Sequence, residues 1–545
     1  MSFGHEQLPT FDLARSRFVI AFGADFLGTW NSPVSQAVAY GAMRQGRPGV
    51  RGMFVQVESR MSQTGANADE WVPVTPGTEG VLALGLAHVI LKEKLRPSDA
   101  AGRAGSLVLG WSDGLTGFAP EAVEKITGVA AKRIERLARE FAAMRPSVAM
   151  VAGPPLAHTN GLFTAIAVNA LNALSGNVGE PGGLYFTPQR SGLQASGSGL
   201  QAFAASLANA SGKPPVEVVL LDGANPMFTA PKAWKVREAL DKAPFIASFG
   251  SFLDDTSSLA DLILPDHSFL ESWVDSAPES GSIVAVASVA APAMHPLHET
   301  RATGDVLLDV AGKLHKPLGL PATYDAMVKA SFAALPAGEG GADAWTVAQK
   351  QGGWWGELPK GTAAVAAGDD AAKKPSRTFT FVDPQFDGDA QQYPYHFLPY
   401  PSSLFLDGSL AHLPWLQEQP DPLTSAMWSS WVELNPKTAE KLGIAPGDVV
   451  EITSAHGAVK AGAVISPGLA PDIIAMPVGQ GHQSFTRFAS GRGENPVAIL
   501  ASVTESETGA LAWAATRVKV ARASGPDGKL IMFAGSLREQ GDLGR

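Results

Sequence analysis

The sequence predicts an α/β protein with two doubly wound, parallel-sheet lobes followed by a small β-barrel. Strands alternate with helices through roughly the first 335 residues, which is typical of parallel sheets. Short strands with frequent turns fill residues 395–522. The chain of 545 residues is long enough for several domains of about 100–200 residues each.

The first lobe is predicted over residues 1–146. It opens with a strand at Arg17–Gly23, followed by a helix at Pro33–Arg44 and a second strand at Gly52–Val57. A short strand, a Pro-Gly turn and an amphipathic helix follow at Val72–Glu93. Apolar residues at helical spacing then predict a helix over Ala119–Ala143.

The second lobe is predicted over residues 147–335, opening with a strand at Ser147 and a helix at Leu162–Leu174. Strands are expected at Val216–Gly223, Phe245–Gly250 and Ala260–Asp266. Residues 336–394 are predicted to be a linker, because their first part is rich in Ala, Gly and Lys. Residues 395–522 form the predicted barrel domain and residues 523–545 a tail.

The stretch Ala439–Val459 carries the barrel prediction. Gly443 is a helix-stop residue, and Pro446-Gly447-Asp448 has turn chemistry. A strand and its return through His456-Gly457 then predict a β-hairpin. Such a barrel, at the end of a large chain, is expected to close over a cofactor.

Composition excludes several functions. The net charge of −10 argues against a nucleic-acid partner. With no cysteine, the chain is expected to hold no disulfide, no thiolate metal site and no cysteine-bound iron–sulfur cluster. The sequence contains no run of about 18 apolar residues, so no transmembrane helix is predicted. The first residues lack the apolar region of a signal peptide.

Ligands of parallel sheets bind outside the carboxyl ends of the strands, so the loops there are the candidate site. Glycine lets backbone approach a ligand, threonine and helix N-termini donate to phosphate, and carboxylates accept from a ribose or a guanine edge. Together these loops indicate a long, phosphate-bearing cofactor across both lobes. The candidate residues are Gly23, Asp25, Arg60, Asp69, Pro76, Gly77, Thr78 and Glu79, then Gly153, Asn160, Gly223, Asn225, Pro226, Phe249, Asp254 and Thr256.

Each loop taken alone has an ordinary alternative as a turn or a helix cap. Neither a G-x-G-x-x-G after a strand nor a P-loop is present. The histidines lack metal-ligand spacing, and His295 and His298 have no third partner, so no metal site is predicted. His158 and Asp25 are candidates for acid–base chemistry, with structural hydrogen bonding as the alternative, and the catalytic residues stay unknown.

The order of these motifs resembles the molybdopterin oxidoreductases, the dimethyl sulfoxide reductase superfamily, over nearly the whole chain. The resemblance rests on FGADFLG, on VESRMSQTGANADEWVPVTPGTEG, on DGANPMFTAP, and on FLDDTSSLADLILPDHSFLES. The closing VELNPKTAEKLGIAPGDVVEITSAHGAV resembles that family's double-psi β-barrel. GADFLGTWNSPV and HLPWLQEQPDPLTSAMW look most like the large iron–sulfur subunit of alternative complex III and of quinone reductase complexes.

The resemblance implies a molybdopterin guanine dinucleotide cofactor, with further contacts from Gly479, Gly481, His482 and Asn495 in the barrel. It implies an iron–sulfur subunit and membrane quinol-interacting subunits as partners. It also implies a place at the periplasmic face of the bacterial cytoplasmic membrane, as a peripheral protein. The family's N-terminal cluster domain and its molybdenum ligand have no counterpart in the sequence, and Glu58-Ser59 stands where the family has Asp-Pro.

Two functions follow from the resemblance. The first is an oxidoreductase subunit in quinol- or quinone-linked respiratory electron transfer, which positions and tunes the cofactor. The second is a cofactor-free structural scaffold of such a complex, in which HLPWLQEQPDPLTSAMW is a docking loop or ordinary domain packing. A truncated molybdoenzyme fragment, inactive alone, is a third and weaker alternative.

Overall fold

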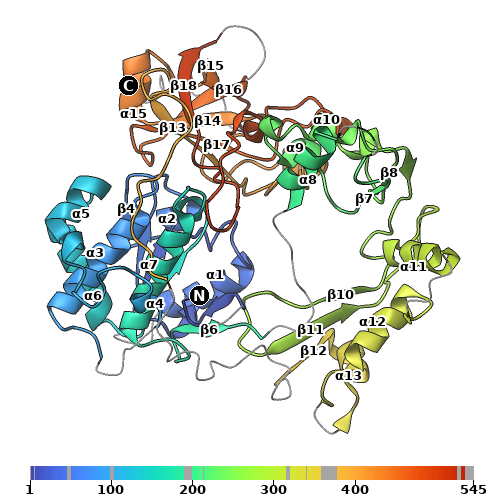
Figure 1. The fold of residues 1–545 in the computed structure, drawn as a ribbon, viewed down its shortest axis with the longest axis horizontal. Helices are drawn as coiled ribbons and strands as arrows, with labels where there is room; N and C mark the ends of the chain where they lie inside the picture. The colour runs from blue at the N-terminus through green and yellow to red at the C-terminus, as the bar shows by residue number, and fades with distance from the viewer. Residues whose placement is uncertain are drawn as a thin grey trace.

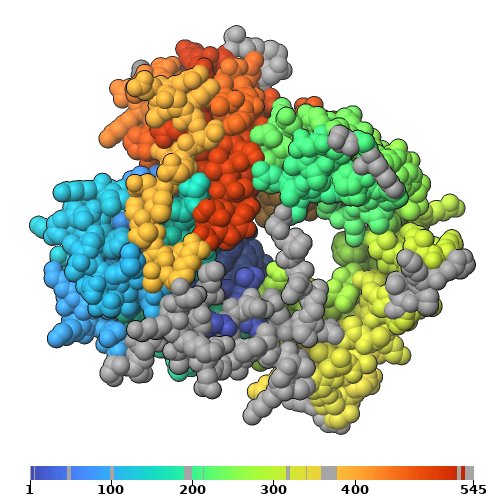
Figure 2. All heavy atoms as spheres, in the orientation of Figure 1, coloured from blue at the N-terminus to red at the C-terminus, as the bar shows by residue number. Residues whose placement is uncertain are grey.

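The computed structural model describes residues 2–4, 7–45, 51–97, 103–188, 199–210, 212, 214–314, 319–338, 341–357, 377–523 and 529–533. A first lobe, a second lobe, an antiparallel region and a barrel surround a gap in the view of Figure 1. The space-filling view in Figure 2 shows this opening between the green second lobe and the yellow antiparallel region. No helix in these ranges combines the length and apolar character needed to cross a membrane.

The first lobe is a four-stranded parallel sheet in the order β4-β3-β2-β5, as predicted for a doubly wound fold. Its strands are β2 (Phe18–Phe22), β3 (Met53–Val57), β4 (Glu70–Val72) and β5 (Ser147–Val151). Its helices are α1 (Pro33–Gln45), α2 (Gln63–Ala66), α3 (Glu79–Lys92), α4 (Arg103–Ser106), α5 (Pro120–Thr127), α6 (Ala131–Ala143) and α7 (Gly161–Ser175).

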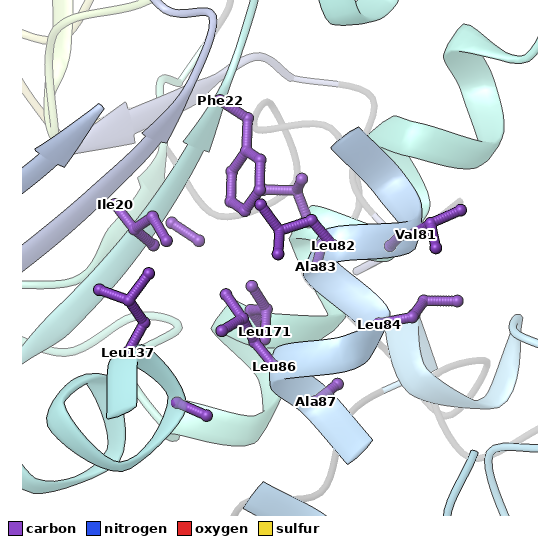
Figure 3. Packing of buried hydrophobic residues seen from close by; sticks show 14 of the residues in the cluster. Ile20, Phe22, Val81, Leu82, Ala83, Leu84, Leu86, Ala87, Leu137 and Leu171 are labelled. Atoms are coloured by element: carbon purple, nitrogen blue, oxygen red, sulfur yellow. The ribbon is translucent and has the colours of Figure 1, made fainter. Parts of the chain in front are cut away.

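The packing of this lobe explains why its strand sequences are continuous runs of apolar residues. All five residues of β2 are buried, because both faces of a parallel sheet are covered. Figure 3 shows Ile20 and Phe22 of β2 packing toward Leu82 and Leu86 of α3 and Leu171 of α7. This packing holds the carboxyl ends of the strands at one edge, where the candidate loops begin.

The strand at Ser147 was predicted to open the second lobe, and this assignment is wrong. β5 pairs in parallel with β2, from Phe18 opposite Ser147 to Phe22 opposite Val151, so it belongs to the first sheet. The helix that follows it, α7, packs against α3 in the same lobe. A strand–loop–helix unit has the same local pattern in either sheet, so only the long-range pairing assigns it.

The second lobe contains a parallel sheet in the order β7-β8-β9. Its strands are β7 (Val219–Leu221), β8 (Ile246–Ser248) and β9 (Leu262–Ile263). The helices α8 (Gly199–Ala208), α9 (Pro226–Thr229) and α10 (Val236–Leu240) accompany it. Side chains of α8 and α10 form one cluster with Val219, Leu221 and Ile246 on one face of the sheet.

An antiparallel region extends the second lobe. It comprises β10 (Val274–Ser276), β11 (Ala285–Ala290), β12 (Gly353–Gly356), α11 (Thr303–Lys313), α12 (Tyr324–Phe332) and α13 (Ala344–Gln351). The assignment of residues 336–394 as a linker is partly wrong. Its residues 344–356 form α13 and β12, because Trp354 and Ala348 bury apolar surface against β11. Residues 358–376 lie outside the described part of the chain.

The barrel is closed, in the order β13-β17-β14-β16-β15-β18. Its strands are β13 (Tyr395–Tyr400), β14 (Trp431–Leu434), β15 (Val449–Ser454), β16 (Gly457–Ile465), β17 (Ile473–Pro477) and β18 (Arg517–Arg522). The short helices α14 (Pro414–Gln417), α15 (Pro436–Leu442) and α16 (Thr486–Ala489) connect them. The predicted hairpin is β15 and β16, and Gly443 ends α15 with a positive φ of 64°. A small sheet of β1 (Pro9–Phe11) and β6 (Leu184–Phe186) flanks the first lobe.

Candidate functional site

A first cavity, of about 140 Å³, lies between the first lobe and the barrel. Gly23, Arg60 and Gly153 reach it from the loops that follow β2, β3 and β5. Asp25 and Glu79 also line it. The structure therefore brings together five of the predicted residues, because parallel strands end at one edge of their sheet.

Arg60 is held by the barrel. Its Nε and Nη2 donate to Glu433 of β14 at 3.0 and 2.7 Å, and its guanidinium lies 3.4 Å from the centre of the Tyr400 ring. Tyr400 donates its hydroxyl to Glu433 at 2.6 Å and accepts from the Trp431 indole at 3.1 Å. Burial acts against the charge of Arg60, but Glu433 and Tyr400 raise its pKa above the ordinary value. The arginine thus joins the first lobe to the barrel.

Two buried carboxyl groups, those of Glu58 and Glu79, line the same cavity as this arginine. Burial raises the pKa of both Glu58 and Glu79 to about 7. Glu58 accepts from the Ser62 backbone at 2.7 Å and from Gln56 at 3.0 Å. Glu79 opens α3, and its Oε2 has no hydrogen-bond partner among the described residues. The first cavity therefore offers acceptors, one of them unsatisfied, and an arginine that is already paired.

The Pro76-Gly77-Thr78 turn lies outside the lining of both cavities described here. Asn160 donates to the Gly77 carbonyl at 2.9 Å, and the Thr78 hydroxyl donates to the Thr75 carbonyl at 2.7 Å. His158 packs beside Gly77, where burial, followed by the nearby His396, lowers its pKa to about 3. These contacts support the shape of the turn.

A second cavity, of about 600 Å³, lies between the second lobe and the barrel. Gly223, Asn225, Pro226 and Asp254 line it from the loops after β7 and β8, and His482 lines it from the barrel. Its aromatic wall also includes Phe228, Phe252, His412 and Phe485. Its size falls within the range of about 300–1,000 Å³ typical of small-molecule sites.

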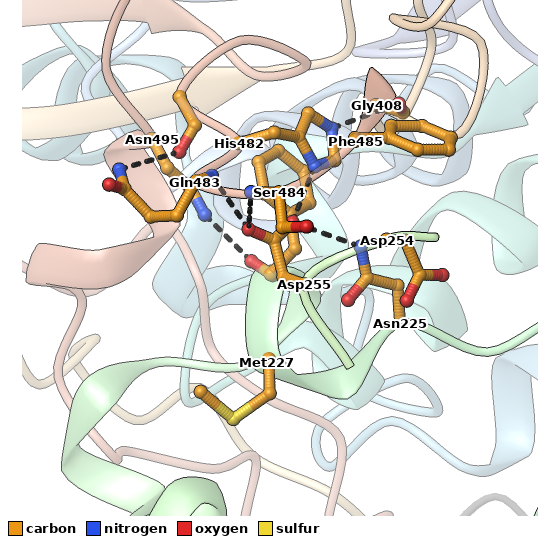
Figure 4. A network of polar contacts seen from close by, with 12 residues as sticks. Asn225, Met227, Asp254, Asp255, Gly408, His482, Gln483, Ser484, Phe485 and Asn495 are labelled. Carbon is orange, nitrogen blue, oxygen red and sulfur yellow. Dashed lines mark hydrogen bonds and ion pairs between the residues drawn. The ribbon is translucent and has the colours of Figure 1, made fainter. Parts of the chain in front are cut away.

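Asp255 and His482 link the second lobe to the barrel (Figure 4). The Nδ1 of His482 lies 2.7 Å from an Asp255 carboxylate oxygen, and its Nε2 lies 3.1 Å from the Gly408 carbonyl. Asp255 also accepts from the backbones of Gln483 and Ser484 at 2.6 and 3.0 Å. Burial acts to raise the pKa of Asp255, but these hydrogen bonds, the His482 contact foremost, lower it overall. His482 stacks on Phe228, with ring centres 3.6 Å apart.

The remaining predicted residues lie outside the lining of both cavities. Asp69 pairs with Arg44 and with Arg51 in the first lobe. Thr256 donates to the Asn225 side chain at 2.7 Å, and Asn495 donates to the Phe228 carbonyl at 2.7 Å, so both brace the second cavity. The backbones of Gly479 and Gly481 approach Phe405 and Asn495, and Phe249 is buried.

Sequence reasoning missed Asp255, Phe228, Glu433 and Tyr400. Asp255 stands next to the predicted Asp254, and only the tertiary contact to His482 distinguishes the two. Glu433 carried a usable signal, since a carboxylate within the apolar strand Trp431–Leu434 requires a partner when it is buried. Its partner, Arg60, lies 373 positions away.

Comparisons with known proteins agree with this architecture. The family described as Molybdopterin oxidoreductase matches residues 4–302, and the Molydopterin dinucleotide binding domain matches residues 416–511. The menaquinone reductase, molybdopterin-binding-like subunit of Nitratidesulfovibrio vulgaris is 31% identical over 94% of this chain and 72% of its own length. The arsenate respiratory reductase molybdopterin-containing subunit of Shewanella sp. is 25% identical over 88% of this chain and 71% of its own.

A solved structure shares the fold. Acetylene hydratase from Pelobacter acetylenicus superposes with a TM-score of 0.74 and covers 95% of this chain and 80% of its own chain. The sequence identity of this pair is 16%, so the likeness concerns the fold alone.

Proposed function

The chain belongs to the molybdopterin oxidoreductase family, in the dimethyl sulfoxide reductase superfamily, and we propose that it is a subunit of a quinone-linked respiratory complex. The observation that carries this proposal is the 31% identity, over 94% of the chain, to a menaquinone reductase subunit. The complex is of the alternative complex III type and lies at the periplasmic face of the cytoplasmic membrane. Its other members are an iron–sulfur subunit and membrane subunits that exchange electrons with quinol.

Within that complex, the chain acts as a scaffold that does not hold the family's cofactor in the first cavity. A pterin dinucleotide carries a pyrophosphate and a nucleoside, and about 140 Å³ is below the usual size of sites for such ligands. Arg60, the only arginine or lysine among the lining residues, is already paired with Glu433. Asp25, Glu58 and Glu79 add carboxyl groups, which oppose a phosphate.

The alternative is a cofactor-bearing subunit that holds molybdopterin guanine dinucleotide in the second cavity. The volume of about 600 Å³ favours this alternative. Asp254 could accept from the N–H groups of a guanine edge, and Phe228 lies at the same wall. The bound group would supply the redox chemistry, and the chain would bind and orient it. The lining includes no lysine or arginine to meet the pyrophosphate.

The test is to isolate the complex from its native membranes through this chain. Its subunits would be identified, electron exchange with a menaquinol analogue measured, and molybdenum, tungsten and released pterin assayed per chain. We expect quinone-linked activity and an iron–sulfur subunit, with metal and pterin far below one equivalent. One pterin equivalent would overturn the scaffold role and favour the second cavity as the cofactor site. A chain isolated without cluster or membrane subunits would overturn the respiratory role.

A further inference from the structure

A third cavity, of about 350 Å³, lies in the barrel domain and is lined by three cationic side chains. These are Lys460 of β16, Arg492 of the loop after α16, and Lys529 near the end of the described chain. Glu494 is the one carboxylate in this lining. The cavity therefore has an excess of positive charge, although the whole chain carries a net charge of −10.

The three cationic groups have no carboxylate partner in the part of the chain that the structure describes. The side chains of Lys460, Arg492 and Lys529 form no ion pair with any described residue. Val459 is buried in the barrel core, and side chains alternate along a strand, so Lys460 points out of the barrel. Glu451 stands opposite Lys460 on β15, but these two side chains form no ion pair.

Arg492 contacts an aromatic ring in place of a carboxylate. Its guanidinium carbon lies 4.5 Å from the centre of the Trp428 ring. Its Nε is buried and has no hydrogen-bond partner among the described residues. A guanidinium matches the oxygens of a phosphate in a two-bond contact. An oxyanion in this cavity would therefore supply the acceptor that Arg492 lacks.

Hydrogen bonds between three segments fix the shape of this cavity. Ser430 accepts from the Glu494 N–H at 2.9 Å, which joins the loop before β14 to the loop after α16. Ser429 accepts from the Ile531 N–H at 3.1 Å, which joins the same loop to the end of the described chain. Gly493 has a positive φ of 62°, and a Cβ at this position would clash with Ser430. The segments that carry the cations are thus held together without a ligand.

The charge and the size of the cavity indicate the class of ligand. The cations outnumber the carboxylate by two, and a phosphomonoester carries a charge of about −1.5 to −2 at pH 7. The volume of about 350 Å³ is enough for a phosphate with a small organic group. The first two cavities differ, because Arg60 in the first is paired with Glu433 and the second has no lysine or arginine in its lining.

We propose that the third cavity is a binding site for a phosphomonoester, whose oxygens contact Lys460, Arg492 and Lys529. The phosphate belongs either to a soluble compound or to the headgroup of an anionic lipid, since both present the same group. The inference rests on the barrel domain alone. It does not require the quinone-linked role or a cofactor in either of the first two cavities.

The test uses the full chain and two probes. Equilibrium dialysis measures the binding of radiolabelled inorganic phosphate, and flotation measures binding to phosphatidylcholine vesicles with and without phosphatidic acid. We expect saturable binding of phosphate, or flotation only with phosphatidic acid, and Arg492→Gln should weaken it by about tenfold or more. Lys460→Gln should weaken it by about threefold. Dialysis binding without flotation would indicate a soluble source, and flotation would indicate a lipid source.

Arg487→Gln is the matched control, because it changes the net charge by the same amount. Arg487 also lies over an aromatic ring, 4.6 Å from the centre of Phe488, but it is outside the lining of the cavity. It should leave binding unchanged. Circular dichroism checks the fold of each variant, and Lys460→Gln carries the test if Arg492→Gln fails to fold. The proposal fails if the wild type binds neither probe, or if the cavity variants bind as tightly as Arg487→Gln.

Discussion

The barrel contacts the two lobes through two buried acid–base pairs of different chemistry. Towards the first lobe, the Arg60 guanidinium meets Glu433 in a two-bond contact whose side chains are 10% and 5% exposed. Towards the second lobe, the His482 imidazole meets Asp255, with side chains 1% and 10% exposed. Arg60 of the first pair lines a cavity of about 140 Å³, and His482 of the second pair lines one of about 600 Å³. In the first lobe, where Arg60 is paired with Glu433 of the barrel, the cavity is the smaller of the two.

The largest expected effect comes from breaking the first pair. Glu433→Ala leaves the Arg60 charge buried without a partner, so we expect the free energy of unfolding to fall by about 3–5 kcal/mol. Urea denaturation followed by tryptophan fluorescence measures this change. The double variant Arg60→Met with Glu433→Leu removes both charges and should recover most of the loss. A double variant as unstable as the single would mean that packing, not charge pairing, dominates this contact.

Breaking the second pair should have a smaller effect. Asp255→Ala leaves the backbone donors of Gln483 and Ser484 unsatisfied, and we expect a loss of about 2–3 kcal/mol at pH 7. The native pKa of Asp255 is lowered from 3.8, so this contribution is present above pH 3.8 and is lost as the pH falls below it. Urea midpoints from pH 7 to pH 3 test the sign. If the difference in urea midpoint between wild type and Asp255→Ala grows as the pH falls, this account is wrong.

The carboxyl group of Glu79 contributes to stability with a pH dependence opposite in sign to that of Asp255. Its pKa rises from 4.5 to about 7 on folding, so its contribution to stability falls as the pH rises from 4.5 to 7. Glu79→Gln should therefore stabilise the protein at pH 8, by about 1–2 kcal/mol, and change little at pH 4.5. Glu121→Gln, an exposed residue on α5, is the control. Equal effects of Glu79→Gln at both pH values would show that Glu79 does not titrate in this range.

The smallest expected effect concerns a surface pair of the same charge type as Arg60 and Glu433. The Nε of Arg237 on α10 lies 3.0 Å from Oδ1 of Asp241, the residue that follows this helix, and the two side chains are 55% and 56% exposed. Exposed pairs gain little because water screens them. Arg237→Ala should leave the urea midpoint unchanged within error. A loss comparable to that of Glu433→Ala would refute burial as the reason for the difference.

The sequence predicted much of the first cavity, because its loops follow strands that a parallel sheet must align. Gly23, Arg60 and Gly153 meet for this reason. The same reasoning placed Asp69 with them, although this side chain turns to Arg44 instead. The position of a loop predicts which residues lie near an edge of a sheet. It does not predict which of their side chains form an ion pair with a nearby residue instead of lining the cavity.

Local pattern by itself determined the hairpin of β15 and β16, the turn at Pro446-Gly447-Asp448 and the alternation of strands with helices. These features depend on residues a few positions apart, whose preferences act before any distant contact forms. Only the tertiary structure decided that β5 joins the first sheet, that Arg60 pairs with Glu433, and that Asp255 pairs with His482. Each of these outcomes depends on which segments, tens to hundreds of residues apart, meet in space, and no local period encodes that choice.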